Sequence, residues 1–169
     1  MRITLQRVSK AICYVDNEIV GKIENGLLIF VGFATNDAFE ILPLAVRKCL
    51  ELRIFNDEND KMNKSVLDIQ GSVLVISQFT LYANCKRGRR PDFTQSASPE
   101  KAKELYEEFV HLFKQNNINV QTGIFAAKMQ IELVNEGPVT INLEFWGFFH
   151  KEKREWRTEG KMKFTRKIG

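Results

Sequence analysis

The sequence predicts a mixed α/β domain in which a largely antiparallel sheet forms a barrel-like β core beside two long helices. Continuous apolar runs of strand length occur at residues 27–33 and 73–76, which is typical of strands buried on both faces. Two longer segments carry apolar residues at helical spacing. The other strand-like segments are grouped toward the ends of the chain instead of alternating with helices, which argues against a doubly wound sheet.

The first part of the chain is predicted to consist of strands. In order, these strands are residues 1–8, 11–16, 18–23 and 27–33. In the first of them Ile3 and Leu5 are expected on one face and the arginines on the other, because successive strand residues point to opposite faces. Asn25-Gly26 is the strongest short hairpin signal and precedes the buried strand.

The middle of the chain is predicted to hold a helix and the second buried strand. Asn36 or Asp37 can cap a helix that extends to about Leu52. Pro43 falls inside this pattern and suits a helix that begins near Leu42, since proline is tolerated in the first turn. A polar loop at residues 56–63 is expected next, followed by a strand at 72–82 and an irregular basic loop at 85–98.

The last third is predicted to contain the second helix and three strands. Ser98 and Pro99 supply a cap residue and a proline at the first helical position, and the apolar pattern continues to about Gln115. The strands are expected at residues 119–122, 130–135 and 139–145. Gly137-Pro138 lies between the last two and predicts a tight turn.

Composition excludes several classes of protein. The 169 residues contain no apolar run of the ~20 residues that a membrane-spanning helix needs, so no membrane association is expected. Three widely spaced cysteines predict neither a disulfide framework nor a zinc site. Two histidines are too few for a histidine-rich metal site. The expectation is a cytoplasmic protein with reduced thiols, no metal and no cofactor.

The positive charge is concentrated at the C-terminus. Residues 147–169 carry eight Lys/Arg and three Asp/Glu among several aromatic residues, whereas the rest of the chain is close to neutral. We therefore divide the chain into a domain at 1–146 and a basic aromatic extension at 147–169. The extension fits a nucleic-acid or anionic partner, and it equally fits a solvating tail.

Three segments could carry chemistry, and each has an ordinary alternative. Ser77, Gln78 and Thr80 end a very apolar strand, where buried polar groups need partners, although a strand edge facing solvent would also explain them. Gly137-Pro138 permits close approach of another chain or ligand, or forms a plain turn. The residues Lys86, Arg87, Arg89 and Arg90 suit phosphate recognition, or form a solvated loop. A Ser-His-Asp relay is not expected, because both histidines lie far from any candidate nucleophile.

Taken together, these segments resemble the D-aminoacyl-tRNA deacylases, first known as D-tyrosyl-tRNA deacylases. The matching pieces occur in the family's order over about residues 1–145 and include Gln6-Arg7-Val8, Leu52-Arg53-Ile54-Phe55, Ser77 to Ala83, Gly88-Arg89-Arg90-Pro91, Met129-Gln130 and Asn135 to Thr140. The resemblance implies that family's fold. It also implies hydrolysis of the ester that joins a D-amino acid, or mischarged glycine, to tRNA, and thus chiral proofreading in translation. It further implies a homodimer with active sites at the interface.

The resemblance also implies roles for individual residues. Backbone N–H groups around Phe79 and Thr80 would stabilise the oxyanion, and Gln78 and Ser77 would orient the adenosine and water. The substrate-binding residues would be Met129, Asn135, Gly137, Pro138 and Thr140, with Gly137-Pro138 as a cis turn that reaches into the partner's pocket and rejects L-amino acids. The residues implied in tRNA binding are Lys86, Arg87, Arg89 and Arg90.

Some alternatives stay open. Thr80 has been considered as a nucleophile, but no general base is evident, so the neighbouring ribose 2′-hydroxyl of the tRNA is the preferred assisting group. A non-catalytic tRNA- or RNA-binding protein on the same fold is the main rival, and a paralogue with relaxed chirality is another. Ala126 stands where the family commonly has glycine, which predicts a slightly tighter pocket.

Overall fold

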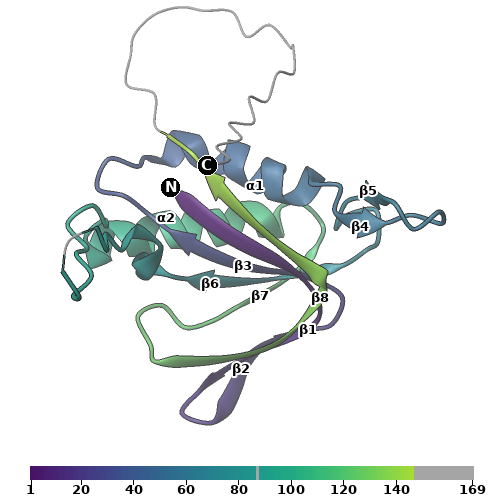
Figure 1. Ribbon diagram of the computed structural model, residues 1–169, viewed down its shortest axis with the longest axis horizontal. Coiled ribbons are helices and arrows are strands. Elements are labelled where there is room, and N and C mark those ends of the chain that lie inside the picture. Colours follow the sequence, from purple (N-terminus) through teal and green to yellow (C-terminus); the bar gives the residue numbers. More distant parts are fainter. Residues whose placement is uncertain (87, 147–169) are drawn as a thin grey trace, which may run out of the picture.

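A computed structural model describes residues 1–86 and 88–146 (Figure 1), so Arg87 and the predicted extension lie outside the described residues. In chain order the elements are β1 (Arg2–Val15), β2 (Glu18–Ile23), β3 (Gly26–Gly32), η1 (Phe39–Ile41), α1 (Leu42–Glu51), β4 (Phe55–Asn56), β5 (Met62–Lys64), β6 (Ser72–Ser77), η2 (Phe79–Tyr82), α2 (Pro99–Lys114), β7 (Asn119–Thr122) and β8 (Met129–Glu144). The predicted mixed α/β architecture with two long helices is confirmed. No helix among these residues is long and apolar enough to cross a membrane.

The long strand β1 organises the sheet. It pairs antiparallel with β2, β3 and β8, whereas β3–β6 and β6–β7 pair in parallel. The antiparallel prediction therefore holds around β1, and the parallel half was not predicted. The long strands β1 and β8 bend across the sheet in Figure 1 and give it a nearly closed, barrel-like form.

Four local predictions are corrected by the structure, and the helix start that Pro43 indicated is confirmed. The first two predicted strands are one continuous β1, and the last two are one β8 interrupted by a bulge. The strand predicted at 72–82 ends at Ser77, where the chain turns into η2. The first helix begins at Leu42, as Pro43 indicated, with η1 before it. Arg7 shares the buried face of Ile3 and Leu5, because residues two apart along a strand point the same way.

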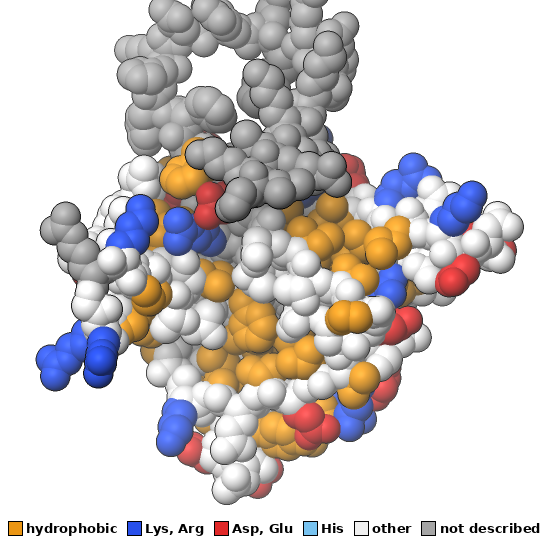
Figure 2. Space-filling view, in the orientation of Figure 1, with side chains coloured by type: hydrophobic (Ala, Val, Ile, Leu, Met, Phe, Trp, Pro, Cys, Tyr) orange, Lys and Arg blue, Asp and Glu red, His pale blue; other side chains and the backbone are white. Residues whose placement is uncertain are grey.

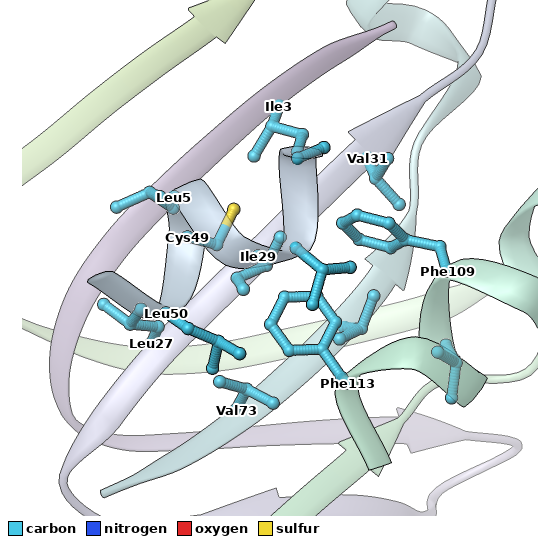
Figure 3. Packing of buried hydrophobic residues seen from close by; sticks show 14 of the residues in the cluster. Ile3, Leu5, Leu27, Ile29, Val31, Cys49, Leu50, Val73, Phe109 and Phe113 are labelled. Carbon is cyan, nitrogen blue, oxygen red and sulfur yellow. The ribbon is translucent and has the colours of Figure 1, made fainter. Parts of the chain in front are cut away.

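The main core lies between the sheet and the two helices (Figure 3). Alternate residues of β1 and the apolar stretches of β3 and β6 face α1 and α2, whose buried residues recur at helical spacing. Phe109 and Phe113 pack edge to face, with ring centroids 5.0 Å apart. Burial raises the pKa of the Cys49 thiol to about 12, so this cysteine is a neutral packing residue.

A smaller core fills the inside of the curled half of the sheet. Val8, Cys13, Leu28 and Leu74 are fully buried there. Residues of β8, including Met129, pack on this cluster from the other side. The second core explains why β8 folds back along β1, since the inner faces of both strands would otherwise leave apolar side chains in water.

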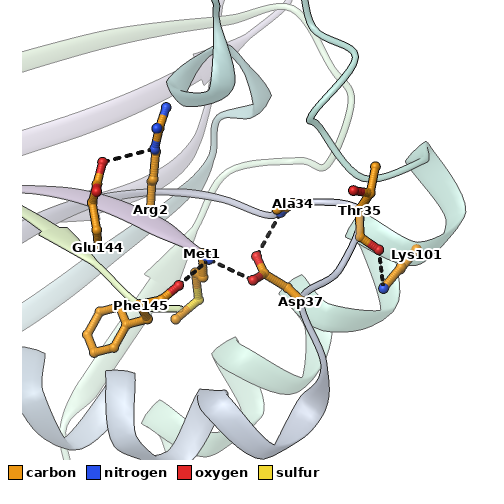
Figure 4. Close-up of polar contacts among 8 residues, drawn as sticks. All are labelled: Met1, Arg2, Ala34, Thr35, Asp37, Lys101, Glu144 and Phe145. Atoms are coloured by element: carbon orange, nitrogen blue, oxygen red, sulfur yellow. Dashed lines mark hydrogen bonds and ion pairs between the residues drawn. The ribbon is translucent and has the colours of Figure 1, made fainter. Parts of the chain in front are cut away.

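The two ends of the described chain are joined beside α1. The N-terminal ammonium of Met1 contacts the Asp37 carboxylate at 2.7 Å and donates to the carbonyl oxygen of Phe145 at 2.8 Å (Figure 4). The second Asp37 oxygen accepts from the N–H of Ala34 at 2.7 Å. Burial lowers the pKa of this ammonium, and the contact with Asp37 opposes that shift. The clamp fixes the first residue of β1 against the end of β8.

Candidate active site

A pocket of about 600 Å³ opens at the carboxyl ends of the parallel strands β3 and β6. The residues lining it are Val31, Gly32, Phe33, Ile76, Ser77, Gln78, Phe79, Phe93, Ser96, Ala97, Pro99, Ala102, Phe125, Ala126, Ala127, Met129 and Ile131. Loops converge where parallel strands end, which makes this edge of a sheet a common place for ligands. The lining is mostly apolar with a few hydroxyl and amide groups, as is typical of small-molecule sites.

None of the residues that line this pocket is titratable. No group of three potential metal ligands occurs within residues 1–86 and 88–146. His111 sits on α2, where its Nε2 lies 2.9 Å from the amide nitrogen of Gln115. The described lining residues therefore offer backbone groups and hydroxyl and amide side chains for any chemistry in the pocket.

The turn that follows β6 presents backbone donors at the pocket. The N–H of Gln78 still belongs to the sheet and donates to the carbonyl oxygen of Val31 at 2.8 Å. The next two N–H groups, of Phe79 and Thr80, have no acceptor among the described residues. The first N–H groups of a helical turn have no partner inside the turn. They form a ready site for negative charge.

The absence of a side chain at Gly32 allows this turn to lie close to β3. A Cβ atom there would lie 2.7 Å from the carbonyl oxygen of Gln78 and 3.2 Å from the Cβ atom of Leu81. Real Cβ atoms do not approach a backbone oxygen so closely. Any larger residue would therefore push the turn away from β3 and re-aim its N–H groups. Sequence reasoning missed Gly32, although it is a glycine within the buried apolar run at residues 27–33.

Side chains around the turn are arranged in pairs. The Gln78 amide donates to the Thr80 hydroxyl at 2.6 Å, and the Thr80 side chain is exposed. Phe79 is also largely exposed, with its ring 5.0 Å from that of Phe93. The Thr80 hydroxyl contacts no described histidine, carboxylate or lysine that could remove its proton. This geometry disfavours Thr80 as a nucleophile.

Ala126, at the departure from the family pattern, adopts a left-handed backbone with φ of 61°. Left-handed conformations cost a non-glycine residue roughly 1–2 kcal/mol, which a glycine would not incur. The larger entropy of glycine in the unfolded chain cancels part of that stabilisation. We therefore expect Ala126→Gly to raise the free energy of unfolding by about 0.5–1 kcal/mol, measured by urea denaturation. Ala127→Gly, in the same loop without a positive φ, is the control and should not stabilise.

Gly137 and Pro138 lie in a bulge of β8. The β1–β8 register jumps between Gln6–Thr140 and Val8–Asn135, so the residues between bulge out of the ladder opposite Arg7. The Gly137-Pro138 peptide bond is cis, and both residues are exposed. The predicted tight turn is thus present inside a continuous strand.

Polar side chains close this bulge from within. The Asn135 side chain accepts from the N–H of Val139 at 3.0 Å and donates to the Thr140 hydroxyl at 3.2 Å. Gln6 donates to the same hydroxyl at 3.0 Å. In the single chain Asn135 and Thr140 therefore support the bulge and do not line the pocket.

Arg7 holds the bulge from below. Only 5% of this residue is exposed, and it donates to the carbonyl oxygens of Ile54 at 2.6 Å and Glu136 at 3.2 Å. It also donates to the Asn56 side chain at 3.1 Å. A Cβ on Gly137 would lie 2.6 Å from the guanidinium nitrogen Nη2. Sequence reasoning gave Arg7 no role and expected it on the face opposite Ile3 and Leu5, although an arginine two residues after Leu5 lies on the apolar face, which is an unusual signal.

The pocket and the bulge do not meet within one chain. Gly137 follows Met129 by eight positions on β8, which corresponds to about 26 Å of extended strand. Of the predicted catalytic and substrate-binding residues, the pocket collects Ser77, Gln78, Phe79 and Met129. The bulge holds Asn135, Gly137, Pro138 and Thr140.

The basic loop follows η2 directly. Backbone hydrogen bonds between Asn84 and Asp92 close it at 2.8 and 3.0 Å. Lys86, Arg89 and Arg90 are exposed on it, and none of the three makes an ion pair within the described part of the chain. The fourth predicted cation, Arg87, is outside the described residues.

Comparisons with known proteins match most of the chain. A family model described as D-Tyr-tRNA(Tyr) deacylase matches residues 4–144. The D-aminoacyl-tRNA deacylases of Fervidobacterium nodosum and Thermosipho africanus are 51% and 52% identical over 144 residues, which is 85% of this chain and 97% of each relative. This chain belongs to the D-aminoacyl-tRNA deacylase family.

Two solved structures share the fold of this chain. The structure titled "c-Myc DNA Unwinding Element Binding Protein" superposes with a TM-score of 0.82 and 36% identity, covering 87% of this chain and all of the other. A probable eukaryotic D-amino acid tRNA deacylase has a TM-score of 0.72 at 19% identity, over 84% and 97% of the two chains, and so supports the fold. The deacylase family match ends at residue 144, so the extension lies beyond it.

Proposed function

We propose that this deacylase-family member hydrolyses the ester between a D-amino acid and the terminal adenosine of tRNA, and that it also accepts glycine mischarged on tRNA. The products are a free amino acid and a reusable tRNA. The observation that carries this proposal is the pair of unpartnered N–H groups of Phe79 and Thr80 beside a pocket without titratable side chains. Such donors stabilise the oxyanion formed during ester hydrolysis and need no ionisable group.

The reaction can be written with these groups alone. Water adds to the ester carbonyl carbon, and the developing oxyanion accepts hydrogen bonds from the N–H groups of Phe79 and Thr80. The bond between the carbonyl carbon and the ribose 3′-oxygen then breaks. The proton that the attacking water loses passes through the adjacent 2′-hydroxyl to the 3′-oxygen, which leaves as the 3′-hydroxyl of the tRNA. Gln78 and Ser77 orient the adenosine and the water, and Met129 contacts the adenine.

Chiral selection is proposed to come from a second copy of the chain. In a two-fold homodimer the exposed Gly137-Pro138 bulge of one subunit enters the partner's pocket. The bulge thereby supplies the wall for chiral selection that the pocket does not have within one chain. Backbone carbonyls of the bulge accept from the substrate ammonium group, and an L side chain collides with the same wall. Glycine has no side chain to collide and is incompletely rejected.

Uncovered surface supports the homodimer. The β8 strand pairs only with β1 among the described strands, so its second edge is open, and open edges are natural pairing sites. Val134 on β8 is 53% exposed. Figure 2 shows apolar side chains gathered in the hollowed centre of the face in view. A two-fold contact would bury the same patch on both copies.

We assign tRNA contact to Lys86, Arg87, Arg89 and Arg90, and we keep the division into a deacylase domain at 1–146 and a basic extension at 147–169. Cytoplasmic location is part of the proposal because aminoacyl-tRNA is the substrate. The alternative is a protein that binds tRNA or RNA on this fold without catalysis. The open N–H pair and its pocket favour catalysis, since a binder needs neither.

Parallel incubation with D-tyrosyl-tRNA and L-tyrosyl-tRNA, followed by loss of the labelled amino acid, tests the proposal. Rapid loss of the D form alone is expected. Loss of both forms would contradict the chiral filter and indicate the relaxed paralogue. Loss of neither, with tRNA still bound, would establish the non-catalytic binder instead.

Salt dependence tests the basic loop. Each phosphate contact contributes about 0.7–0.9 to the slope of log K against log salt concentration. Replacing Lys86, Arg89 and Arg90 together by glutamine is therefore expected to reduce that slope by about two units in a tRNA-binding titration. The matched control replaces Lys22, Lys48 and Lys61, which are exposed elsewhere and change the net charge equally. Equal slopes for the two triple variants would exclude a specific role for the loop.

A further inference from the structure

Arg2 contacts the candidate catalytic turn from outside it. Its Nη1 donates to the carbonyl oxygen of Leu81 at 2.9 Å, and its guanidinium carbon lies 4.7 Å from the centroid of the Tyr82 ring. The guanidinium group thus holds two consecutive residues of η2 by a hydrogen bond and a cation–π contact.

The turn itself has few internal bonds. Across η2 the N–H of Leu81 donates to the carbonyl oxygen of Gln78 at a long 3.3 Å, and the N–H of Ala83 donates to that of Thr80 at 2.9 Å. A four-residue 3₁₀ turn of this kind is weakly determined by its own hydrogen bonds. The direction of its first N–H groups therefore depends on contacts from neighbouring elements.

Arg2 is well placed to supply such a contact. It begins β1 and lies between Gly32 of β3 and Glu144 of β8 in the sheet. Its Nε lies 3.1 Å from a Glu144 carboxylate oxygen, as an ion pair without the alignment of a hydrogen bond. Figure 4 shows the two side chains side by side above the N-terminal clamp of Met1.

The two arginines of β1 have similar structural roles. Arg7 fixes the Gly137-Pro138 bulge, and Arg2 fixes the turn that carries the N–H groups of Phe79 and Thr80. Because β1 is paired along both edges, it is a rigid base for both.

We infer that Arg2 is a positioning residue for the hydrolysis: it holds Leu81 and Tyr82 so that the N–H groups of Phe79 and Thr80 point at the oxyanion, without contacting substrate itself. This inference rests on the proposed function. A wild-type protein inactive on D-tyrosyl-tRNA would remove the proposed function, whereas an active wild type with unaffected Arg2 variants would remove this inference alone.

The test is the single-turnover rate and KM for D-tyrosyl-tRNA in Arg2→Met, which keeps the apolar stem, and in Arg2→Lys. A misplacement of about 1 Å in a reacting geometry costs roughly 10²-fold in rate. We expect Arg2→Met to lower the rate by about that factor with KM changed less than threefold. Arg2→Lys keeps the charge near Tyr82 but loses the planar fork, and should lose about tenfold.

Two control variants separate positioning from strand pairing. Glu144→Gln removes the ion pair and leaves the Leu81 and Tyr82 contacts, and Lys10→Met removes the other β1–β8 ion pair, Lys10–Glu132, at 3.5 Å. Both should keep the wild-type rate within twofold. A rate loss in either control as large as in Arg2→Met, or a full rate in Arg2→Met, would overturn the inference. Thermal unfolding of all four variants shows whether a rate loss merely follows lost stability.

Discussion

The substitution Gly137→Ala is expected to raise hydrolysis of L-tyrosyl-tRNA by about 10²-fold while hydrolysis of the D form changes only a few-fold. Steric discrimination of small groups is worth about that factor. Gly137 has φ of +114°, and an added Cβ would lie 2.6 Å from Nη2 of Arg7. Arg7 is held by Ile54 and Asn56 and has little freedom to move aside, so the bulge must shift.

The measurement is the ratio of initial rates on D- and L-tyrosyl-tRNA. Glu136→Ala is the matched control, because it changes an exposed side chain of the same bulge and keeps the carbonyl that Arg7 contacts. It should retain full rejection of the L form. Unchanged rejection in Gly137→Ala would contradict the assignment of the filter to this bulge.

Mixed dimers can decide whether the filter acts across the subunit interface. Ala127→Trp is designed to fill the pocket, which Ala127 lines, while leaving the bulge intact. Differently tagged Gly137→Ala and Ala127→Trp chains are co-expressed, and the heterodimer is purified over both tags. If the filter acts in trans, the open pocket faces an intact bulge and hydrolyses only the D form.

A filter that acted within its own subunit would give the opposite result. The heterodimer would then keep the L-hydrolysing activity of the Gly137→Ala chain, at half its rate per dimer. Failure of the two chains to copurify would contradict the homodimer itself. Wild-type chain mixed with Ala127→Trp serves as the reference for D-specific activity.

The second large effect is expected at Gly32. In Gly32→Ala the new Cβ meets the Gln78 carbonyl oxygen at 2.7 Å, and the turn must move away from β3 with its N–H groups. Loss of one oxyanion donor costs roughly 10²–10³-fold in kcat. We expect kcat for D-tyrosyl-tRNA to fall by about 10²-fold with a small change in KM.

Gly71→Ala is the control for general crowding. It introduces a similarly tight contact, 2.9 Å from a methyl group of Val66, at the opposite end of β6 from the turn. Both variants should lose stability in urea denaturation, but only Gly32→Ala should lose kcat. Parallel losses of kcat in the two variants would show that the effect at Gly32 is destabilisation rather than misaligned donors.

Much of the site was predictable because its signals are local. Ser77, Gln78 and Thr80 were predicted as a polar end of a very apolar strand, and that strand does open onto a pocket, which Ser77 and Gln78 line. Gly137-Pro138 marked a turn, and the turn is present. Gly32 and Arg7 were missed because their roles arise from contacts with Gln78 and Gly137 far along the chain.

The fold shows the same division. The helices at Leu42–Glu51 and Pro99–Lys114 follow from apolar spacing, proline position and capping, which act within a few residues. The single long β1 was predicted as two strands. Its two halves do pair with different partners, β3 and β2, but the backbone continues between them without a break. The end of β6 at Ser77 was misplaced because Phe79, Thr80 and Tyr82 have high strand propensity, which packing against Arg2 and Gly32 overrides.

The sequence by itself determined the mixed α/β class, the two helices, the buried strands and the family, since each depends on residue type and short-range pattern. Only the tertiary structure decided which strands run parallel and that Arg7 lies buried beneath the bulge. It also separated the bulge from the pocket along β8. The reason is physical: strand pairing and close approach at a glycine depend on atoms that are distant in sequence, and no local propensity encodes those distances.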